Sequence, residues 1–131
     1  MENLEEKLGK ETVLVVDDFF PQLDIVKRIL ELESKYHIIL ADSGESALKI
    51  LNSKEHKVNM VISDTDMPGM SGIELYHKIV ENKDLSYLKD KFLLVSGNEQ
   101  EEAVAEGINF IKKGYSVDEF IKRVESIAYG G

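Results

Sequence analysis

The chain has 131 residues, the usual length of one domain, with little room for a second folded unit. It contains no cysteine, which excludes disulfide bonds, thiolate metal sites and a cysteine nucleophile. Sixteen basic and 25 acidic residues give a net charge of −9, and such a surface repels nucleic-acid phosphates and anionic lipids. No apolar run approaches the ~20 residues of a membrane span, and the acidic first residues do not resemble a signal peptide. We therefore expect a cytoplasmic domain with no nucleic-acid and no membrane partner.

The chain divides into a short polar leader and one domain. We expect the leader over residues 1–11 and the domain over residues 12–131, where short apolar runs alternate with stretches of helical periodicity. The apolar runs predict five strands, at residues 13–16, 37–41, 60–63, 92–95 and 109–112. The periodic stretches predict five helices, at residues 21–32, 42–51, 71–81, 101–106 and 117–128. Asp42 with Glu45 predicts a capping box for the second helix, and Ser116 opens a similar box for the fifth.

Alternating strands and helices predict an α/β fold with a doubly wound parallel sheet covered on both faces. Right-handed crossovers leave few strand orders, and 2-1-3-4-5 is a common one at this length. Ligands bind such sheets beyond the carboxyl ends of the strands, at the point where the winding direction reverses. In this order that point lies between the first and third strands.

Three aspartates follow these two strands: Asp17 and Asp18 after the first, and Asp64 after the third. Aspartate is common at strand ends as a turn or cap residue, but three at the expected ligand site favour a binding function. Two unit charges ~5 Å apart repel by roughly 3 kcal/mol at an effective dielectric constant of ~20, so the cluster needs a cation. Oxygen ligands at a shallow, wet rim favour Mg²⁺ over Ca²⁺.

The ends of the last two strands carry complementary groups. Ser96 supplies a hydroxyl after the fourth strand, and Lys113 supplies an ammonium suited to phosphate oxygens after the fifth. Acid, metal, hydroxyl and ammonium together predict a phosphoryl-transfer site. Its nucleophile should be an aspartate, because no cysteine or histidine lies at these strand ends.

At these residues the sequence resembles a response-regulator receiver domain of two-component signalling, in particular the stand-alone chemotaxis regulators. The resemblance covers residues 12–129, and its matching segments are Val-Leu-Val-Val-Asp-Asp at 13–18, Met-Val-Ile-Ser-Asp-Thr-Asp-Met-Pro-Gly-Met-Ser-Gly at 60–72, Phe-Leu-Leu-Val-Ser-Gly at 92–97 and Phe-Ile-Lys-Lys at 110–113. It implies a flavodoxin-like fold, a single receiver domain without an output domain, and a signalling protein that catalyses only its own phosphorylation and dephosphorylation.

The resemblance also implies the residues of the acceptor site. Asp64 would take a phosphoryl group from a phosphohistidine of a sensor histidine kinase or phosphotransfer protein, forming an aspartyl phosphate. Mg²⁺ would be held by Asp18, Asp64 and the backbone carbonyl of Asp66, with Asp17 acting through a bound water.

Three further residues would respond to the phosphoryl group. Lys113 would pair with the acceptor carboxylate and then with the phosphoryl group, and Ser96 would donate its hydroxyl to it. Phe110, at the aromatic switch position of the family, would turn inward and change the surface offered to a downstream protein. The sequence names neither the kinase nor this target, and it leaves oligomeric state and phosphorylation lifetime open.

Two features depart from the family pattern. Gly114 stands where the family usually has a proline in a cis bond, so a trans bond or a remodelled turn is expected after Lys113. The interval from Ser96 to Lys113 is several residues shorter than usual, so the fourth helix should have at most two turns. This helix commonly belongs to the output surface, which makes the position of that surface uncertain from sequence.

Two alternatives remain open. The segment Asp64-Thr65-Asp66 resembles the nucleophile motif of haloacid-dehalogenase phosphatases, although that family places it after the first strand. The chain could also be a pseudo-receiver that only binds partners.

Some other conspicuous residues are better explained as structural or surface residues than as catalytic or binding residues. His77 is interpreted as a surface residue, and Tyr76, Phe19 and Phe20 as packing residues. The side chain of Asp66 should reach solvent near the pocket, where it could tune hydrolysis.

Overall fold

A computed structural model describes residues 10–130 of the chain. The strands in this part are β1 (Glu11–Val16), β2 (Tyr36–Ala41), β3 (Met60–Asp64), β4 (Phe92–Ser96) and β5 (Asn109–Lys112). The helices are α2 (Phe20–Glu31), α3 (Gly44–Ser53), α4 (Gly72–Glu81), α5 (Glu101–Glu106) and α6 (Val117–Tyr129), with a 3₁₀ helix η1 (Ser86–Lys91) before β4. None of the helices in this range is long and apolar enough to cross a membrane.

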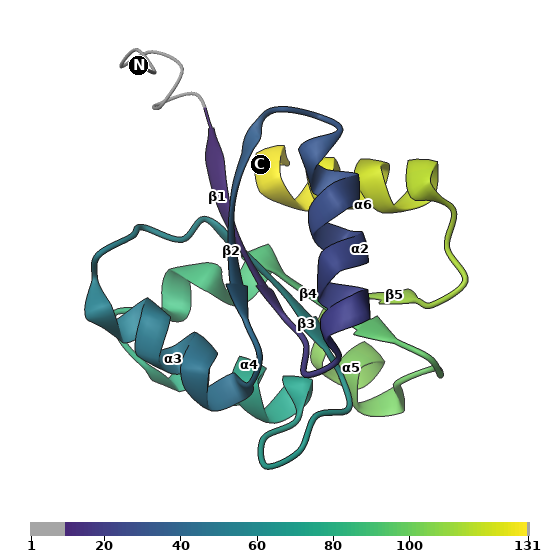
Figure 1. The fold of residues 1–131 in the computed structure, drawn as a ribbon. Coiled ribbons are helices and arrows are strands. Elements are labelled where there is room, and N and C mark those ends of the chain that lie inside the picture. The colour runs from purple at the N-terminus through teal and green to yellow at the C-terminus, as the bar shows by residue number, and fades with distance from the viewer. Residues whose placement is uncertain (1–9, 131) are drawn as a thin grey trace.

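The strands form one parallel sheet in the order β2-β1-β3-β4-β5, which confirms the predicted topology (Figure 1). β1 begins at Glu11, so the last residue of the predicted leader already lies in the sheet. Residues 1–9 of that leader lie outside the described residues. The pairing of Val16 with Ser63 sets the carboxyl ends of the two central strands side by side.

Both faces of the sheet are covered by helices, as its almost continuous apolar strands require. Val13 and Val15 belong to a buried cluster with residues of α2 and α6, while Leu14 and Val16 belong to a second cluster with residues of α3, α4 and α5. Figure 1 shows these two groups of helices on opposite sides of the sheet. The same alternation continues on β3 and β4, so each face has its own buried cluster. The strands that lead to the site are therefore held by buried side chains on both faces of the sheet.

The cap of α3 differs from the prediction. The Ser43 hydroxyl accepts a hydrogen bond from the Ser46 backbone N–H at 3.0 Å, and the Ser46 hydroxyl accepts one from the Ser43 N–H at 3.2 Å. The capping box is therefore Ser43/Ser46, and the predicted Asp42/Glu45 box is wrong by one position. Asp42 has a different role, because its carboxylate accepts a bond from the Ser46 hydroxyl.

Both predicted departures near the end of the sheet are confirmed. α5 has six residues, fewer than two turns, and ends at Gly107 in the left-handed conformation that favours glycine. The peptide bond from Lys113 to Gly114 is trans. Gly114 has a φ of 102°, which a residue with a side chain rarely adopts, so glycine suits the remodelled turn.

Candidate functional site

The three predicted aspartates meet at the carboxyl ends of β1 and β3. One carboxylate oxygen of each of Asp17, Asp18 and Asp64 lies within 4.8 Å of the other two. Asp17 and Asp64 are buried, with 6% and 8% of their surfaces exposed, whereas Asp18 is exposed. Two buried carboxylates at this distance repel strongly, and their oxygen donors match the preference of Mg²⁺. The residues present therefore fit a magnesium ion.

Asp17 shows the electrostatic cost of this arrangement. Burial raises the pKa of its carboxyl group, and the charges of Asp64 and Asp18 raise it further. A hydrogen bond from the Phe19 N–H to Asp17 Oδ1, at 3.0 Å, and the charge of Lys113 oppose this shift without cancelling it. The cluster has more negative charge than its protein neighbours neutralise, as expected of a cation site.

The Asp17→Asn variant should therefore be more stable than the wild-type chain in metal-free buffer at neutral pH, by about 0.5–2 kcal/mol. The amide oxygen can still accept the Phe19 hydrogen bond, but the charge is gone. The ordinary pKa of an aspartate, 3.8, applies to the unfolded chain, and the folded-state pKa of Asp17 lies above it. Between these two pKa values the folded chain binds more protons than the unfolded chain. This carboxyl group thus makes wild-type stability fall as pH rises through that window. Urea unfolding measures the difference, and equal stabilities would contradict the prediction.

Among residues 10–130, Lys113 places a positively charged ammonium group at the aspartate cluster. It follows β5, and its Nζ lies 3.1 Å from Asp64 Oδ1. Burial is the largest single influence and lowers the pKa of Lys113, but the hydrogen bond to Asp64 and the charges of Asp64 and Asp17 outweigh it and raise the pKa overall. The ammonium is therefore charged and held against the carboxylate that the sequence identified as the acceptor.

Ser96 ends β4 at the same edge of the sheet, but its hydroxyl is engaged elsewhere. It donates to the Asn98 carbonyl at 2.6 Å and accepts from the Asn98 N–H and the Gln100 Nε2. The Lys113 N–H bonds to the Ser96 carbonyl, which joins the ends of β4 and β5. Sequence reasoning did not find Gln100, because nothing in the sequence shows that the loop turns back onto Ser96.

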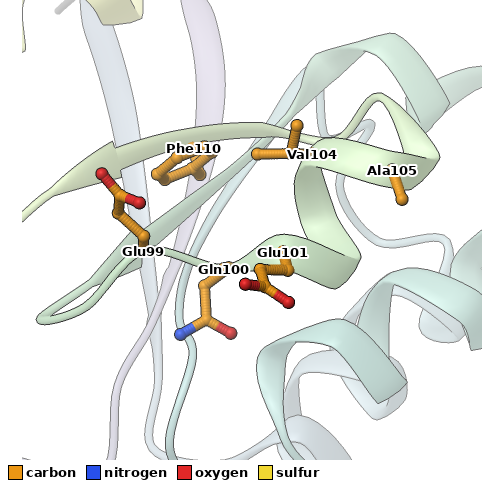
Figure 2. A pocket seen from close by; sticks show the side chains of 6 residues that line it. All are labelled: Glu99, Gln100, Glu101, Val104, Ala105 and Phe110. Carbon is orange, nitrogen blue, oxygen red and sulfur yellow. The ribbon is translucent and has the colours of Figure 1, made fainter.

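Phe110 lies on β5, partly buried against the cluster that contains Leu94. Figure 2 shows it beside α5, where a hollow of about 430 Å³ is lined by Glu99, Gln100, Glu101, Val104, Ala105 and Phe110. The predicted switch residue therefore borders open space next to the short helix. The side chain of Asp66 is exposed, as expected, while the use of its backbone carbonyl as a ligand stays a prediction.

The aromatic residues near the site are only partly as predicted. Tyr76 is a packing residue, because it is buried against Phe92. Phe19 and Phe20 are not, since 63% and 69% of their surfaces are exposed where the chain leaves the aspartate pair. The packing interpretation of this pair is wrong: α2 turns its apolar stripe inward only from Leu23 onward.

Tyr115 is a neighbour of the site that the sequence did not reveal. Its ring stacks on Phe120 with centroids 4.8 Å apart, and its hydroxyl accepts a hydrogen bond from Gln22 Nε2 at 3.4 Å. Burial raises the pKa of this hydroxyl, the Gln22 bond and the Lys113 charge lower it, and Asp17 raises it. Tyr115 thus lies within the electrostatic reach of the cluster and ties the loop after β5 to α2.

Comparisons with known proteins agree with this geometry. The family described as the response regulator receiver domain matches residues 13–125. Chemotaxis protein CheY-3 of Vibrio cholerae is 32% identical over 108 residues, covering 82% of this chain and 80% of that protein. Putative two-component response regulator ARR21 of Arabidopsis thaliana is 34% identical over 105 residues, covering 79% of this chain.

Solved structures show the same fold. Response regulator TrrA of Thermotoga maritima, in complex with Mg(2+)-BeF, has a TM-score of 0.76 and 30% identity, covering 89% of this chain and 98% of that one. A receiver domain protein from Clostridium thermocellum has a TM-score of 0.78 and 20% identity, covering 91% and 94% of the two chains.

Some relatives are much longer than this chain, which spans only 17% of ARR21 and 5% of the virulence sensor protein BvgS of Bordetella pertussis. The match nevertheless includes most of β1 and all of β3 and β5, together with the three aspartates and Lys113. The chain therefore belongs to the response regulator receiver domain family of two-component signalling.

Proposed function

We propose that the chain accepts a phosphoryl group on Asp64 from a phosphohistidine of a sensor histidine kinase or phosphotransfer protein. The observation that carries this proposal is the ion pair from Lys113 to Asp64 within the aspartate cluster. A buried carboxylate with a fixed ammonium beside it is an oriented nucleophile. The ammonium can then pair with the phosphoryl oxygens as negative charge develops on them.

In the transfer, an Asp64 oxygen forms a bond to phosphorus while the bond from phosphorus to the donor nitrogen breaks. Lys113 stabilises the negative charge that gathers on the phosphoryl oxygens. Mg²⁺, held by Asp17, Asp18, Asp64 and the Asp66 carbonyl, would neutralise charge on the same oxygens. Attack of water on the aspartyl phosphate returns the carboxylate and releases phosphate.

Transmission of the signal would begin at Ser96. Its hydroxyl must leave the Asn98 carbonyl and Gln100 before it can donate to a phosphoryl oxygen on Asp64. The loop that it now holds leads directly into α5, so this exchange would move the short helix. The hollow beside Phe110 gives that ring and α5 space to rearrange, and the altered surface would bind a downstream protein.

The surroundings of the site support a protein donor. Phe19 and Phe20 expose their rings directly after Asp17 and Asp18, which gives the rim of the site an apolar surface that a protein partner could cover. A phosphohistidine reaching Asp64 from that side would bring its own protein surface onto these rings.

The test is intact mass spectrometry after incubation with a small acyl phosphate and Mg²⁺. The wild-type chain should gain one phosphoryl group, and it should gain none without the metal or in the Asp64→Asn variant. Asp66→Asn, which changes an exposed carboxylate two residues away, is the matched control and should still be labelled.

The same experiment separates the alternatives. Labelling that survives in Asp64→Asn would reject the proposed acceptor. A wild-type chain that stays unmodified even with a phosphorylated phosphotransfer protein would indicate a pseudo-receiver. Steady turnover of a generic phosphate ester would indicate a phosphatase, which the family match and the position of Asp64 after β3 already argue against.

A further inference from the structure

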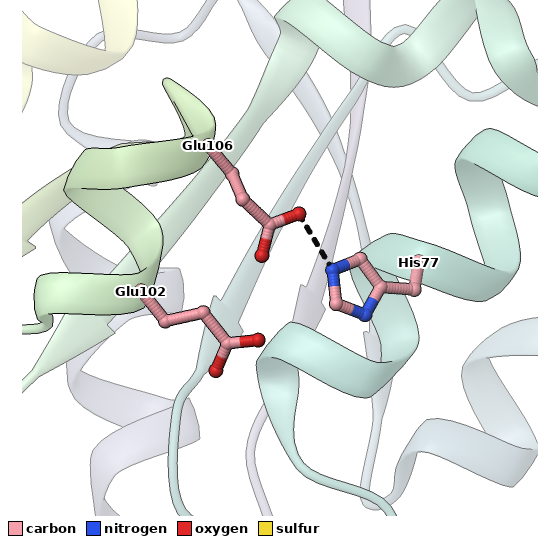
Figure 3. A group of neighbouring side chains, drawn as sticks. All are labelled: His77, Glu102 and Glu106. Atoms are coloured by element: carbon pink, nitrogen blue, oxygen red, sulfur yellow. Dashed lines mark hydrogen bonds and ion pairs between the residues drawn. The ribbon is translucent and has the colours of Figure 1, made fainter.

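A second cluster of metal-ligating side chains lies away from the aspartate pocket, between α4 and α5. His77 on α4 faces Glu102 and Glu106 on α5, and one ligand atom of each lies within 4.8 Å of the others. The His77 Nε2 is 2.8 Å from Glu106 Oε1. Figure 3 shows the imidazole and both carboxylates pointing into the same gap between the helices.

Each of the two helices is anchored by its own buried side chains. The spacing of Glu102 and Glu106 places both on one face of α5, and the burial of Ala103 orients that face. On α4, the buried residues Tyr76 and Ile79 hold the helix so that His77 lies at its edge. These buried residues of α4 and α5 bring the three side chains near one another.

The charges within the cluster are not balanced. Glu106 pairs with His77, but the carboxylate of Glu102 has neither a hydrogen bond nor an ion pair with any residue in 10–130. Two carboxylates one helical turn apart repel each other. A bound cation would remove this repulsion and would give Glu102 a partner.

We propose that His77, Glu102 and Glu106 form a binding site for a divalent transition-metal ion, best matched by Zn²⁺. Imidazole nitrogen and carboxylate oxygen are both zinc ligands, whereas Mg²⁺ prefers oxygen donors alone. Ligand atoms about 2.0–2.2 Å from a tetrahedral zinc ion stand roughly 3.3–3.5 Å apart, which small side-chain rotations can reach from the observed spacing. Water would complete the coordination, and Zn²⁺ would replace the Nε2 proton.

Such an ion would join α5 to α4. α5 has only six residues and one buried side chain, Ala103, so few contacts hold it. A metal bridge would restrain the helix that follows the Ser96 loop. The site itself does not depend on phosphorylation, so it can be tested separately from the proposed function.

Binding can be measured by isothermal titration of the full chain with Zn²⁺ in the presence of excess Mg²⁺ to fill the aspartate pocket. We expect one zinc ion per chain. His77→Gln should abolish this binding, and Glu102→Gln or Glu106→Gln should weaken it by about tenfold or more. Asp64→Asn should still bind, which would separate the new site from the acceptor pocket.

Two matched controls address other surface sites. Glu101→Gln changes a neighbouring glutamate of α5 outside the cluster and should leave zinc binding unchanged. His56→Gln disrupts a pair of histidines outside the cluster, in which the His37 and His56 rings lie 6.1 Å apart, and it should also have no effect.

Circular dichroism without metal confirms that each variant is folded. Absence of zinc binding by the wild-type chain, binding that survives in His77→Gln, or binding lost in His56→Gln would each overturn the proposal.

Discussion

The Lys113→Met variant should accept a phosphoryl group from a small acyl phosphate about 10²–10³ times more slowly than the wild-type chain. Methionine preserves the length and much of the packing of lysine but has no charge. Asp64 would lose the ammonium 3.1 Å from its Oδ1, and the charge on the phosphoryl oxygens would lose its fixed protein cation. The rate of mass gain at saturating Mg²⁺ measures the effect.

Lys112→Met is the matched control, because the Lys112 side chain is exposed and also lies at the end of β5. It should be phosphorylated at the wild-type rate. If Lys113→Met were labelled equally fast, its ammonium would have no part in the transfer and the proposed mechanism would be wrong.

The charged Lys113 side chain also stabilises the folded chain. Its folded-state pKa is raised above 10.5, so its contribution is fully present below that value and is lost as pH rises through the folded-state pKa. Lys113→Met should therefore be less stable than Lys112→Met in metal-free buffer at neutral pH.

The fold followed from the sequence because its signals are local and mutually consistent. Four-residue apolar runs bounded by helical periodicity leave few arrangements besides a doubly wound parallel sheet. The same reasoning found Asp17, Asp18 and Asp64, since strand ends in such a sheet must meet at one edge. The short α5 was predictable too, because the interval from Ser96 to Lys113 is several residues shorter than is usual in the family.

The features that the sequence did not reveal are those that depend on the direction of individual side chains. The Ser96 hydroxyl turns toward Asn98 and Gln100, and its choice among acceptors depends on a loop with no periodic pattern. The exposure of Phe19 and Phe20 was missed because an aromatic pair beside a strand usually packs inward. His77 was interpreted as a surface residue, since its partner Glu106 is distant in sequence and meets it only in the folded chain.

The Gly72→Ala variant should lose about 1–3 kcal/mol of unfolding free energy, the usual cost of overfilling a packed interior. A Cβ on Gly72 would overlap the backbone carbonyl oxygen of Asp64 and would lie 2.7 Å from Leu94 Cδ2. The Gly72 N–H also donates to the Thr65 carbonyl at 2.9 Å, which ties the start of α4 to the residue after Asp64. The backbone of Asp64 cannot move away easily, because β3 is hydrogen-bonded to strands on both sides.

The same substitution should slow phosphorylation, because relief of the overlap requires movement of Asp64 itself. A displacement of about 1 Å at a reacting group costs ~10²-fold in rate. Gly97→Ala is the matched control: Gly97 also follows a strand at the site edge, but a Cβ there meets no atom within 4 Å. Its stability should stay within about 1 kcal/mol of wild type. Urea unfolding and mass-detected labelling measure both properties, and equal losses in the two variants would show that the contact at Asp64 is not the cause.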